Sequence, residues 1–369
     1  MTASSSPGNG VSQPVRAVRD LAHGRWKAEV LDTVLRLGIP DLLGDEPVAV
    51  EQLAAATGAH PEALGRLLHL AATLGLCEKA DGPAFRATEE TALLRSEHPG
   101  PLRTECRHVL SEWGRIAWTH LELAVRTGNS GFTAATGVGV FDFLAEHPSE
   151  SAVFHAFQGQ VTRRNAAALR AADLLPATGV LIDVGGGNGT LLSTLLADAP
   201  GLRGVVYDRA EVVDQGDLGD CGGRLSRVAG DFIDPSAGEP LPAGADVYLL
   251  SHVLHDWPDE QAVAILAGIA AALGPDSRLL VLENVLQDGC PSLLVNYLDV
   301  LMLTAWGSRE RSVAAYQELF RQAGLVPVAE HPLAPAGGLT ALLARRHRVT
   351  SAPPCAADVR TSSVRRVPR

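Results

Sequence analysis

The spacing of apolar residues divides the chain into two parts. From about residue 15 to residue 171, apolar side chains recur every three or four positions, as Val30, Val34 and Leu37 do in WKAEVLDTVLRLGI. This spacing predicts amphipathic helices. From about residue 176, apolar runs such as VLIDV, GVVYD and DVYLLSHV alternate with helical patterns over 190–198 and 259–273. Such alternation predicts an α/β domain with a doubly wound parallel sheet, covered by helices on both faces.

Within the helical part, residues 48–88 have the pattern of a winged helix-turn-helix. A short helix over 51–56 is expected to end at Gly58, and a longer one to begin at Pro61 and end at Gly75. Proline suits the first helical turn and glycine the position after a helix end. A hairpin is expected around residues 81–82, where Asp and Gly are adjacent.

A winged helix-turn-helix binds DNA through its second helix, or serves as a packing and dimerisation module of the same shape. Here the second helix offers Glu62, Arg66 and His69, without a cluster of basic residues. The whole chain carries a formal charge of −11. Because DNA affinity depends largely on cationic side chains that displace counterions, the pattern favours dimerisation over nucleic-acid binding.

Length and composition predict two domains with tails. The 369 residues exceed one ordinary domain. The expected organisation is a disordered leader (1–14), a winged-helix-like dimerisation domain (15–100), a helical connector and substrate-capping region (101–175), a Rossmann-like domain (176–347) and a disordered basic tail (348–369). No secretory signal or membrane-length apolar run is present, and the five cysteines are scattered, which favours reduced thiols and a cytoplasmic location.

The first predicted strand of the α/β part runs into a glycine-rich turn, VLIDVGGGNGTLL. Gly185, Gly187 and Gly189 let the backbone turn tightly and approach a ligand, and the following helix start favours an anionic group. A nicotinamide-dinucleotide fingerprint would require a third glycine where Thr190 stands. The turn therefore predicts a ligand site and disfavours a dehydrogenase.

Further polar residues follow the next strands in order. Asp208 ends GVVYD, Asp231 lies in AGDFID, and His255 ends the apolar run in DVYLLSHVLHDWPDE. In open α/β sheets, ligands bind beyond the carboxyl ends of the strands. Two acids at such ends suit a ligand that contains a nucleoside, and a histidine there suits proton transfer near neutral pH. Each acid taken alone is also a common turn or helix-cap residue.

The segment NYLDVLMLTAWGSRERS predicts an amphipathic helix that leads to Glu310. Asn296, Met302 and Trp306 share one face of it. A flat aromatic substrate suits such a lining, although residues at this spacing also form ordinary cores. Glu310 is expected beside the histidine; its alternatives are helix capping or a salt bridge with Arg309 or Arg311.

Several motifs together resemble a known family. LIDVGGGNG, YDRAEVV, GDF, ADVYLLSHVLHDWPDE, LLVLENVL and SRERS are similar to S-adenosylmethionine-dependent O-methyltransferases of the plant caffeic acid type and their bacterial relatives in aromatic antibiotic pathways. The resemblance covers roughly residues 25–344. It implies a Rossmann-like methyltransferase domain preceded by a helical winged-helix-like dimerisation domain. It also implies S-adenosylmethionine as cofactor, an aromatic small-molecule substrate and a homodimer, with no metal, membrane or nucleic-acid partner.

The resemblance also implies roles for individual residues. His255 would take the substrate hydroxyl proton, with Glu283 and Glu310 flanking it and Asp256 beside it. Residues expected to bind the cofactor are Asp183, Gly185, Gly187, Gly189, Asp208, Asp231, Phe232 and Ser251. Residues expected to line the substrate pocket are Trp113, Phe154, Phe157, Gln158, Asn296, Met302 and Trp306. The helices near Arg25 and Trp26 would reach the partner's active site.

Two departures from the plant pattern stand out. Ser251 replaces a lysine near the cofactor, and YDRA replaces FDLP around Asp208. Competing hypotheses are a ligand-sensing transcription regulator and a relative that uses the same cofactor for N-methylation, decarboxylation or hydroxylation.

Overall fold

The computed structural model describes residues 12–100, 102–213, 221–234, 236, 238–287, 292–334 and 338–347. The expected basic tail lies outside the described residues, as does most of the expected leader. Helix α1 begins at Gln13, inside the segment expected to be the leader. Among the described residues, no helix combines the length and apolarity needed to cross a bilayer.

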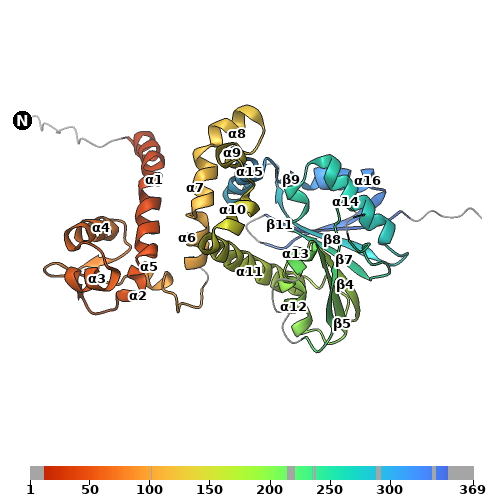
Figure 1. Cartoon of the computed structure of the whole chain (residues 1–369), viewed down its shortest axis with the longest axis horizontal. Helices are drawn as coiled ribbons and strands as arrows, with labels where there is room; N and C mark the ends of the chain where they lie inside the picture. The colour runs from red at the N-terminus through yellow and green to blue at the C-terminus, as the bar shows by residue number, and fades with distance from the viewer. Residues whose placement is uncertain are drawn as a thin grey trace, which may run out of the picture.

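The N-terminal module is a winged helix, as its pattern predicts. It contains α1 (Gln13–Arg36), α2 (Ile39–Leu42), α3 (Val50–Thr57), α4 (Pro61–Thr73) and α5 (Glu89–Leu93). A small sheet with the order β1-β3-β2 is made of β1 (Val48–Ala49), β2 (Glu78–Lys79) and β3 (Ala84–Arg86). Leu53, Leu68 and Phe85 pack in its core. Figure 1 shows this module at one end of the molecule and the large sheet at the other.

A bundle of helices connects the two ends. It consists of α6 (Leu102–Val109), α7 (Glu112–Thr119), α8 (Leu121–Thr127), α9 (Gly131–Thr136), α10 (Val140–Glu146) and α11 (Pro148–Ala171). A later helix, α15 (Leu293–Trp306), packs against α7, α8 and α9 (Figure 1). Trp113, Phe132 and Phe154 form part of the shared core. The bundle thus places aromatic side chains beside the segment that leads to Glu310.

The large sheet has the order β10-β11-β8-β7-β4-β5-β6, with β9 paired to β8. Its strands are β4 (Gly179–Val184), β5 (Leu202–Asp208), β6 (Leu225–Ala229), β7 (Val247–Ser251), β8 (Arg278–Leu286), β9 (Arg311–Ser312), β10 (Leu325–Pro332) and β11 (Leu339–Arg346). The pairs among β4 to β8 are parallel. Strands β10 and β11 run antiparallel, so the expectation of a wholly parallel sheet is corrected at this edge.

Helices cover both faces of the sheet, as the doubly wound prediction requires. On one face lie α14 (Asp259–Ala272) and α16 (Val313–Gln322); on the other lie α11 and α12 (Thr190–Ala197). A short helix, α13 (Ala210–Val213), follows β5. Alternate residues of a strand join opposite cores, as Ile182 and Leu181 do. The expected Rossmann-like fold is therefore confirmed.

Candidate active site

His255 lies just beyond the strand that the sequence predicted to contain it. Strand β7 ends at Ser251, and His255 occupies a single 3₁₀ turn, η1 (Leu254–Asp256). The chain turns here because the buried carboxylate of Glu283 on β8 accepts hydrogen bonds from the backbone N–H groups of Val253 and Leu254, at 3.2 and 2.9 Å. The imidazole therefore lies in the loop after β7, where ligands bind in such sheets, and not at the end of the strand itself.

Three carboxyl groups surround the His255 imidazole. Its Nδ1 lies 3.1 Å from Glu310 Oε1 and 3.5 Å from Glu283 Oε2, and its Nε2 lies 3.6 Å from Asp256 Oδ1. Glu283 and Glu310 are buried, whereas the His255 side chain keeps 13% of its surface exposed. The sequence predicted all four residues, and the structure brings them together.

The carboxylates control the charge of the imidazole. Burial by itself lowers the pKa of His255, but the charges of Glu283, Asp256 and Glu310 outweigh burial and raise the pKa to about 10. Burial also raises the pKa of Glu283, against the opposing influence of the imidazolium. In the protein alone, His255 therefore holds its proton at neutral pH, and it becomes a base when that proton leaves.

The alternative salt bridge for Glu310 is wrong. Arg309 and Arg311 both pair with Asp259 at the start of α14. Arg311 also donates to the carbonyl oxygens of Leu254 and Trp257, at 2.7 and 2.6 Å, and so fastens the turn that carries His255. The Glu310 backbone N–H donates to Asp299 Oδ1 at 2.9 Å, and the Glu310 carboxylate contacts the imidazole.

The glycine turn after β4 forms an open cradle beside Asp208. Asp208 Oδ2 accepts from the Gly187 N–H at 2.8 Å, and Oδ1 accepts from the Arg209 N–H at 2.8 Å. Gly187 has φ +59°, and a side chain built there would enter open space. A ligand can therefore approach the backbone at this point. The turn also packs against the imidazole loop, because a Cβ at Gly185 would lie 2.9 Å from Val253 Cγ2.

The other residues expected to bind the cofactor occupy the same edge of the sheet. Phe232 packs near Gly185 and meets Trp257 edge-on, with ring centroids 6.2 Å apart. Asp231 Oδ1 accepts from the Ile233 and Asp234 N–H groups, which shapes the loop after β6. Ser251 is half-buried at the end of β7. The Asp183 carboxyl lies under Gly186, and burial together with the charge of Asp208 raises its pKa to about 7.

The expected substrate-lining residues divide into two groups. Trp113, Phe154 and Met302 are buried, and Phe157 and Trp306 are half-buried. Trp113 contacts Phe154 and Trp306 edge-on, at centroid distances of 6.0 and 5.6 Å. Gln158 and Asn296 are exposed and outside this aromatic cluster.

Sequence reasoning missed two histidines near the site. His108 stacks on Phe157 with ring centroids 4.1 Å apart, and burial lowers its pKa to about 4. His252 lies with its ring centroid 5.5 Å from that of His255. His252 was visible three residues before His255, but no periodicity marks which of two neighbouring histidines turns inward. His108 carried no signal in its helical pattern.

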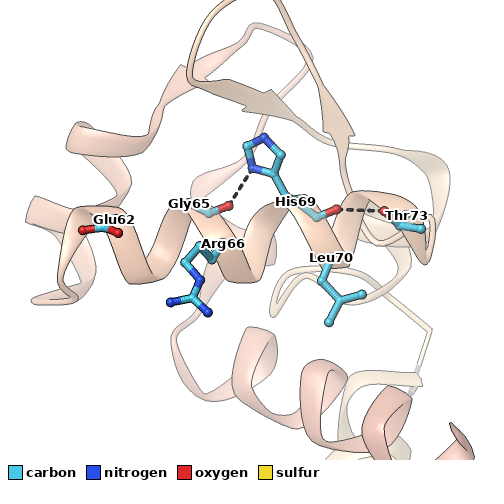
Figure 2. A pocket seen from close by; sticks show the side chains of 6 residues that line it. All are labelled: Glu62, Gly65, Arg66, His69, Leu70 and Thr73. Atoms are coloured by element: carbon cyan, nitrogen blue, oxygen red, sulfur yellow. Dashed lines mark hydrogen bonds between the residues drawn. The ribbon is translucent and has the colours of Figure 1, made fainter.

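A hollow lies far from this chemistry, on the outer face of α4. Figure 2 shows the six residues that line it: Glu62, Gly65, Arg66, His69, Leu70 and Thr73. The His69 ring nitrogen Nδ1 is already hydrogen-bonded to the Gly65 carbonyl oxygen at 2.7 Å. One acid, one arginine and one histidine make no cationic surface for a phosphate backbone.

Comparison with known proteins agrees with this geometry. The family model for an O-methyltransferase domain matches residues 118–326, and that for an O-methyltransferase dimerisation domain matches residues 19–96. The chain belongs to the O-methyltransferase family. It is 36% identical over 316 residues to mitomycin biosynthesis 6-O-methyltransferase from Streptomyces lavendulae, covering 84% of this chain and 88% of that protein.

Two solved structures extend the similarity. The mitomycin 7-O-methyltransferase has a TM-score of 0.82 and 34% identity, with 90% of this chain and 98% of that one covered. An O-methyltransferase from neocarzinostatin biosynthesis, solved with S-adenosyl-L-homocysteine and 1,4-dihydroxy-2-naphthoic acid, has a TM-score of 0.74 and 31% identity over 93% and 100% of the two chains. This protein is an S-adenosylmethionine-dependent O-methyltransferase.

The described residues fit that cofactor. The open space at Gly187 admits a ligand against the turn, and Asp208 presents a carboxylate already held by two backbone donors. A carboxylate at this position suits ribose hydroxyls. Phe232 offers an apolar ring nearby for a base.

Proposed function

We propose that this O-methyltransferase methylates a hydroxyl group of an aromatic secondary metabolite, with His255 as the general base. The observation that carries the proposal is the partly exposed imidazole held between three carboxyl groups, beside the glycine cradle. When bound, S-adenosylmethionine supplies an electrophilic methyl group. The protein's own tasks are to orient the acceptor oxygen and to remove its proton.

The surroundings of His255 suit a phenol. A phenol has a pKa of about 10 in water, and the carboxylates raise the pKa of the His255 imidazolium to about 10 as well. Transfer of the hydroxyl proton to the neutral imidazole is therefore nearly balanced. Glu310 and Glu283 then stabilise the imidazolium that forms, as in other oriented bases. At pH 7, however, little of the imidazole is neutral: removing its proton costs about 4 kcal/mol, which corresponds to three pKa units.

We assign the cofactor to Gly185, Gly187, Gly189, Asp208, Asp231 and Phe232, with Asp183 and Ser251 shaping the cradle. Asp208 would hold the ribose, because its two oxygens each keep one lone pair free of the backbone N–H bonds. The loop of Asp231 and Phe232 would hold the adenine. Ser251 cannot supply the positive charge that lysine gives plant members.

The aromatic cluster supports an aromatic acceptor that carries polar ring substituents. Among the described residues, His108 Nδ1 and the indole nitrogens of Trp113 and Trp306 are buried without a hydrogen-bond partner. An unpaired buried polar atom is costly, so such atoms favour a ligand that pairs with them. We assign Phe157, Met302 and Trp306 to the pocket wall and Trp113 and Phe154 to the layer behind it. Gln158 and Asn296 would lie at the entrance.

We further propose a cytoplasmic homodimer without a nucleic-acid partner. The outer side of α1 exposes Val18, Leu21 and Trp26, and Leu21 is 80% exposed. An apolar face of this kind favours burial against a second copy. We propose the same domain limits as the sequence indicated: a dimerisation domain over 15–100, a helical connector over 101–175 and the Rossmann-like domain over 176–347. Light scattering of Leu21→Glu tests it: a monomer supports the α1 interface, and an unchanged dimer contradicts it.

The test of the reaction is a mass-shift assay with S-adenosylmethionine labelled in its methyl group, against phenolic polyketides and aromatic acids. The proposal expects one labelled methyl per product, located on oxygen. A labelled methyl on nitrogen, or a product that gains oxygen without label, would replace O-methylation by one of the competing reactions. We also expect that the protein does not shift duplex DNA in a mobility assay at low salt, because the α4 surface is not cationic.

A further inference from the structure

His252 is held in an unusual backbone conformation beside the catalytic histidine. Its φ is +54°, and Asp173 is the one other non-glycine residue with positive φ in the described chain. Its backbone N–H donates to the Leu282 carbonyl oxygen at 2.9 Å, so the conformation is anchored to β8. A left-handed residue persists only where its surroundings hold it, and such residues concentrate at functional sites.

Asn165 on α11 fixes the proton position of the His252 ring. Asn165 is 1% exposed, and its Nδ2 donates to His252 Nε2 at 2.9 Å. A ring nitrogen that accepts a hydrogen bond carries no proton, so a neutral His252 has its proton on Nδ1. The two residues are 87 positions apart, which means that the fold brings them together.

One Glu283 oxygen near the His252 Nδ1 nitrogen has no hydrogen-bond partner. His252 Nδ1 lies 3.9 Å from Glu283 Oε2. Glu283 Oε1 already accepts two backbone hydrogen bonds, whereas Oε2 is buried without a hydrogen-bond partner. A hydrogen bond to this oxygen would require the two atoms to approach by about 0.7 Å or more. Glu283 Oε2 is also the atom that lies 3.5 Å from His255 Nδ1.

The His252 ring stays uncharged in this setting. Burial, followed by the positive charges of His255 and Arg164, lowers its pKa to about 3. The charged groups around the pair are Glu283, His255 and Arg164, with Glu310 at His255 Nδ1 beside Glu283 and Asp256 at His255 Nε2. A neutral N–H can therefore orient the Glu283 carboxylate without cancelling its charge.

We propose that Asn165 and His252 are positioning residues for the base: Asn165 sets the His252 tautomer, and the His252 Nδ1–H keeps Glu283 ionised and aimed at His255. This inference rests on the proposed role of His255. In this arrangement His252 orients the Glu283 carboxylate, and the carboxylate stabilises the His255 imidazolium. Without that donor, Glu283 takes up a proton more readily, and His255 loses part of the negative charge that stabilises its imidazolium.

A divalent cation is a less suitable occupant of the same place. The ligand atoms of His252, His255 and Glu283 lie within 4.8 Å of one another. A tetrahedral zinc with bonds of about 2.0–2.1 Å needs ligand atoms about 3.3 Å apart. The 3.9 Å between His252 Nδ1 and Glu283 Oε2 exceeds this spacing, and the His252 Nε2 nitrogen is already bonded to the Asn165 amide.

The test uses the full-length enzyme and two variants, His252→Asn and Asn165→Leu. Asparagine tolerates the left-handed backbone but is too short to bridge to Glu283; leucine keeps the size of Asn165 without its amide. Each variant should lower kcat about tenfold, the effect of one hydrogen bond. The acidic limb of the kcat/KM profile should move to lower pH, and KM for the acceptor should change less than about twofold.

The double variant tests whether the two residues act as one chain. Because Asn165 acts through His252, the double variant should lose no more than His252→Asn alone, whereas independent residues would multiply their losses. His147→Asn is the matched control, since its ring nitrogen Nδ1 also makes one local hydrogen bond, donated to the Phe143 carbonyl oxygen, but lies outside the site. The control should retain the wild-type pH profile.

Failure of this inference is separable from failure of the proposed function. If His255→Ala keeps wild-type turnover, the base assignment itself is wrong. If His255→Ala is inactive but both variants keep the wild-type profile, only the positioning role is overturned. Nitrogen NMR of labelled histidine gives a reading that does not depend on activity: a neutral His252 with its proton on Nδ1 supports the inference, and a proton on Nε2 overturns it.

Discussion

The hollow on α4 and the cluster of charged residues around η1 contain similar residue types but differ in chemistry. On α4, Glu62, Arg66 and His69 line a surface hollow, and the His69 ring nitrogen is bonded to a backbone carbonyl (Figure 2). Around η1, His255 touches carboxylates of which two are buried, each with one oxygen that has no hydrogen-bond partner. The first region is distinguished only by its shape, whereas the second contains buried carboxylates with incomplete hydrogen bonding.

The two regions differ in what their charged groups cost the folded protein. Buried carboxylates without full hydrogen bonding reduce stability, so their retention indicates a use that outweighs the cost. An exposed set of charges carries no such cost and needs no such explanation. The contrast therefore predicts large functional effects around η1 and small ones on α4.

The largest expected effect is the loss of the base. His255→Ala should lower turnover about 10²–10⁴-fold, the usual contribution of a base positioned to take the substrate proton. Affinity for S-adenosylmethionine, measured by calorimetry, should stay within about twofold. His69→Ala serves as the matched control on α4 and should keep wild-type turnover. Comparable losses in both variants would remove the distinction between the two regions.

Removal of the ribose ligand should affect binding more than chemistry. Asp208→Ala should weaken S-adenosylmethionine binding about 10–100-fold, the range expected for hydrogen bonds to a charged group. Glu318→Ala is the control, because this exposed acid pairs with Arg321 on α16, away from the cofactor residues. An unchanged dissociation constant for Asp208→Ala would reject the ribose assignment.

The pH profile gives a smaller but more specific effect. Because Glu310 helps to raise the pKa of His255 to about 10, the free enzyme should become more active as the pH rises and the imidazolium loses its proton. Glu310→Gln removes one of these charges, so the pKa falls and the acidic limb of kcat/KM moves to lower pH by about one unit. Kinetics between pH 6 and 10 would show it. A limb that stays in place would exclude Glu310 as a partner of His255.

The smallest effect is expected on α4. Arg66→Ala should change the free energy of unfolding by less than about 0.5 kcal/mol, as surface substitutions usually do. Turnover should be unchanged, and the variant, like the wild type, should not shift DNA. A loss of turnover in Arg66→Ala, measured on a variant that unfolds normally, would give the α4 hollow a function that its chemistry does not suggest.

The sequence predicted the fold because its local signals agree with one another. Pro61 and the glycine after α4 delimit a helix that forms as expected, and apolar runs ending in Asp208 and Ser251 form buried parallel strands. The antiparallel strands β10 and β11 were missed. Strand pairing at a sheet edge depends on contacts between distant residues, which periodicity does not report.

The site was predictable where motifs mark strand ends, and less so where packing decides. His255, Glu283 and Glu310 come together from three separate segments, as the motifs indicated. The position of His255 in a turn depends on Glu283 accepting from two backbone N–H groups, which no local pattern reveals. The contact between Asn165 and His252 joins α11 to the loop after β7, and only the folded chain shows it.

The most direct test of His255 as the base compares wild type with His255→Ala on acceptors of graded acidity. Phenols that the enzyme methylates, with pKa values from about 10 down to about 7, need progressively less help to lose their proton. The penalty of His255→Ala should therefore be greatest for the least acidic phenol and shrink as acidity rises. A penalty that stays constant across the series would contradict a proton-accepting role for His255.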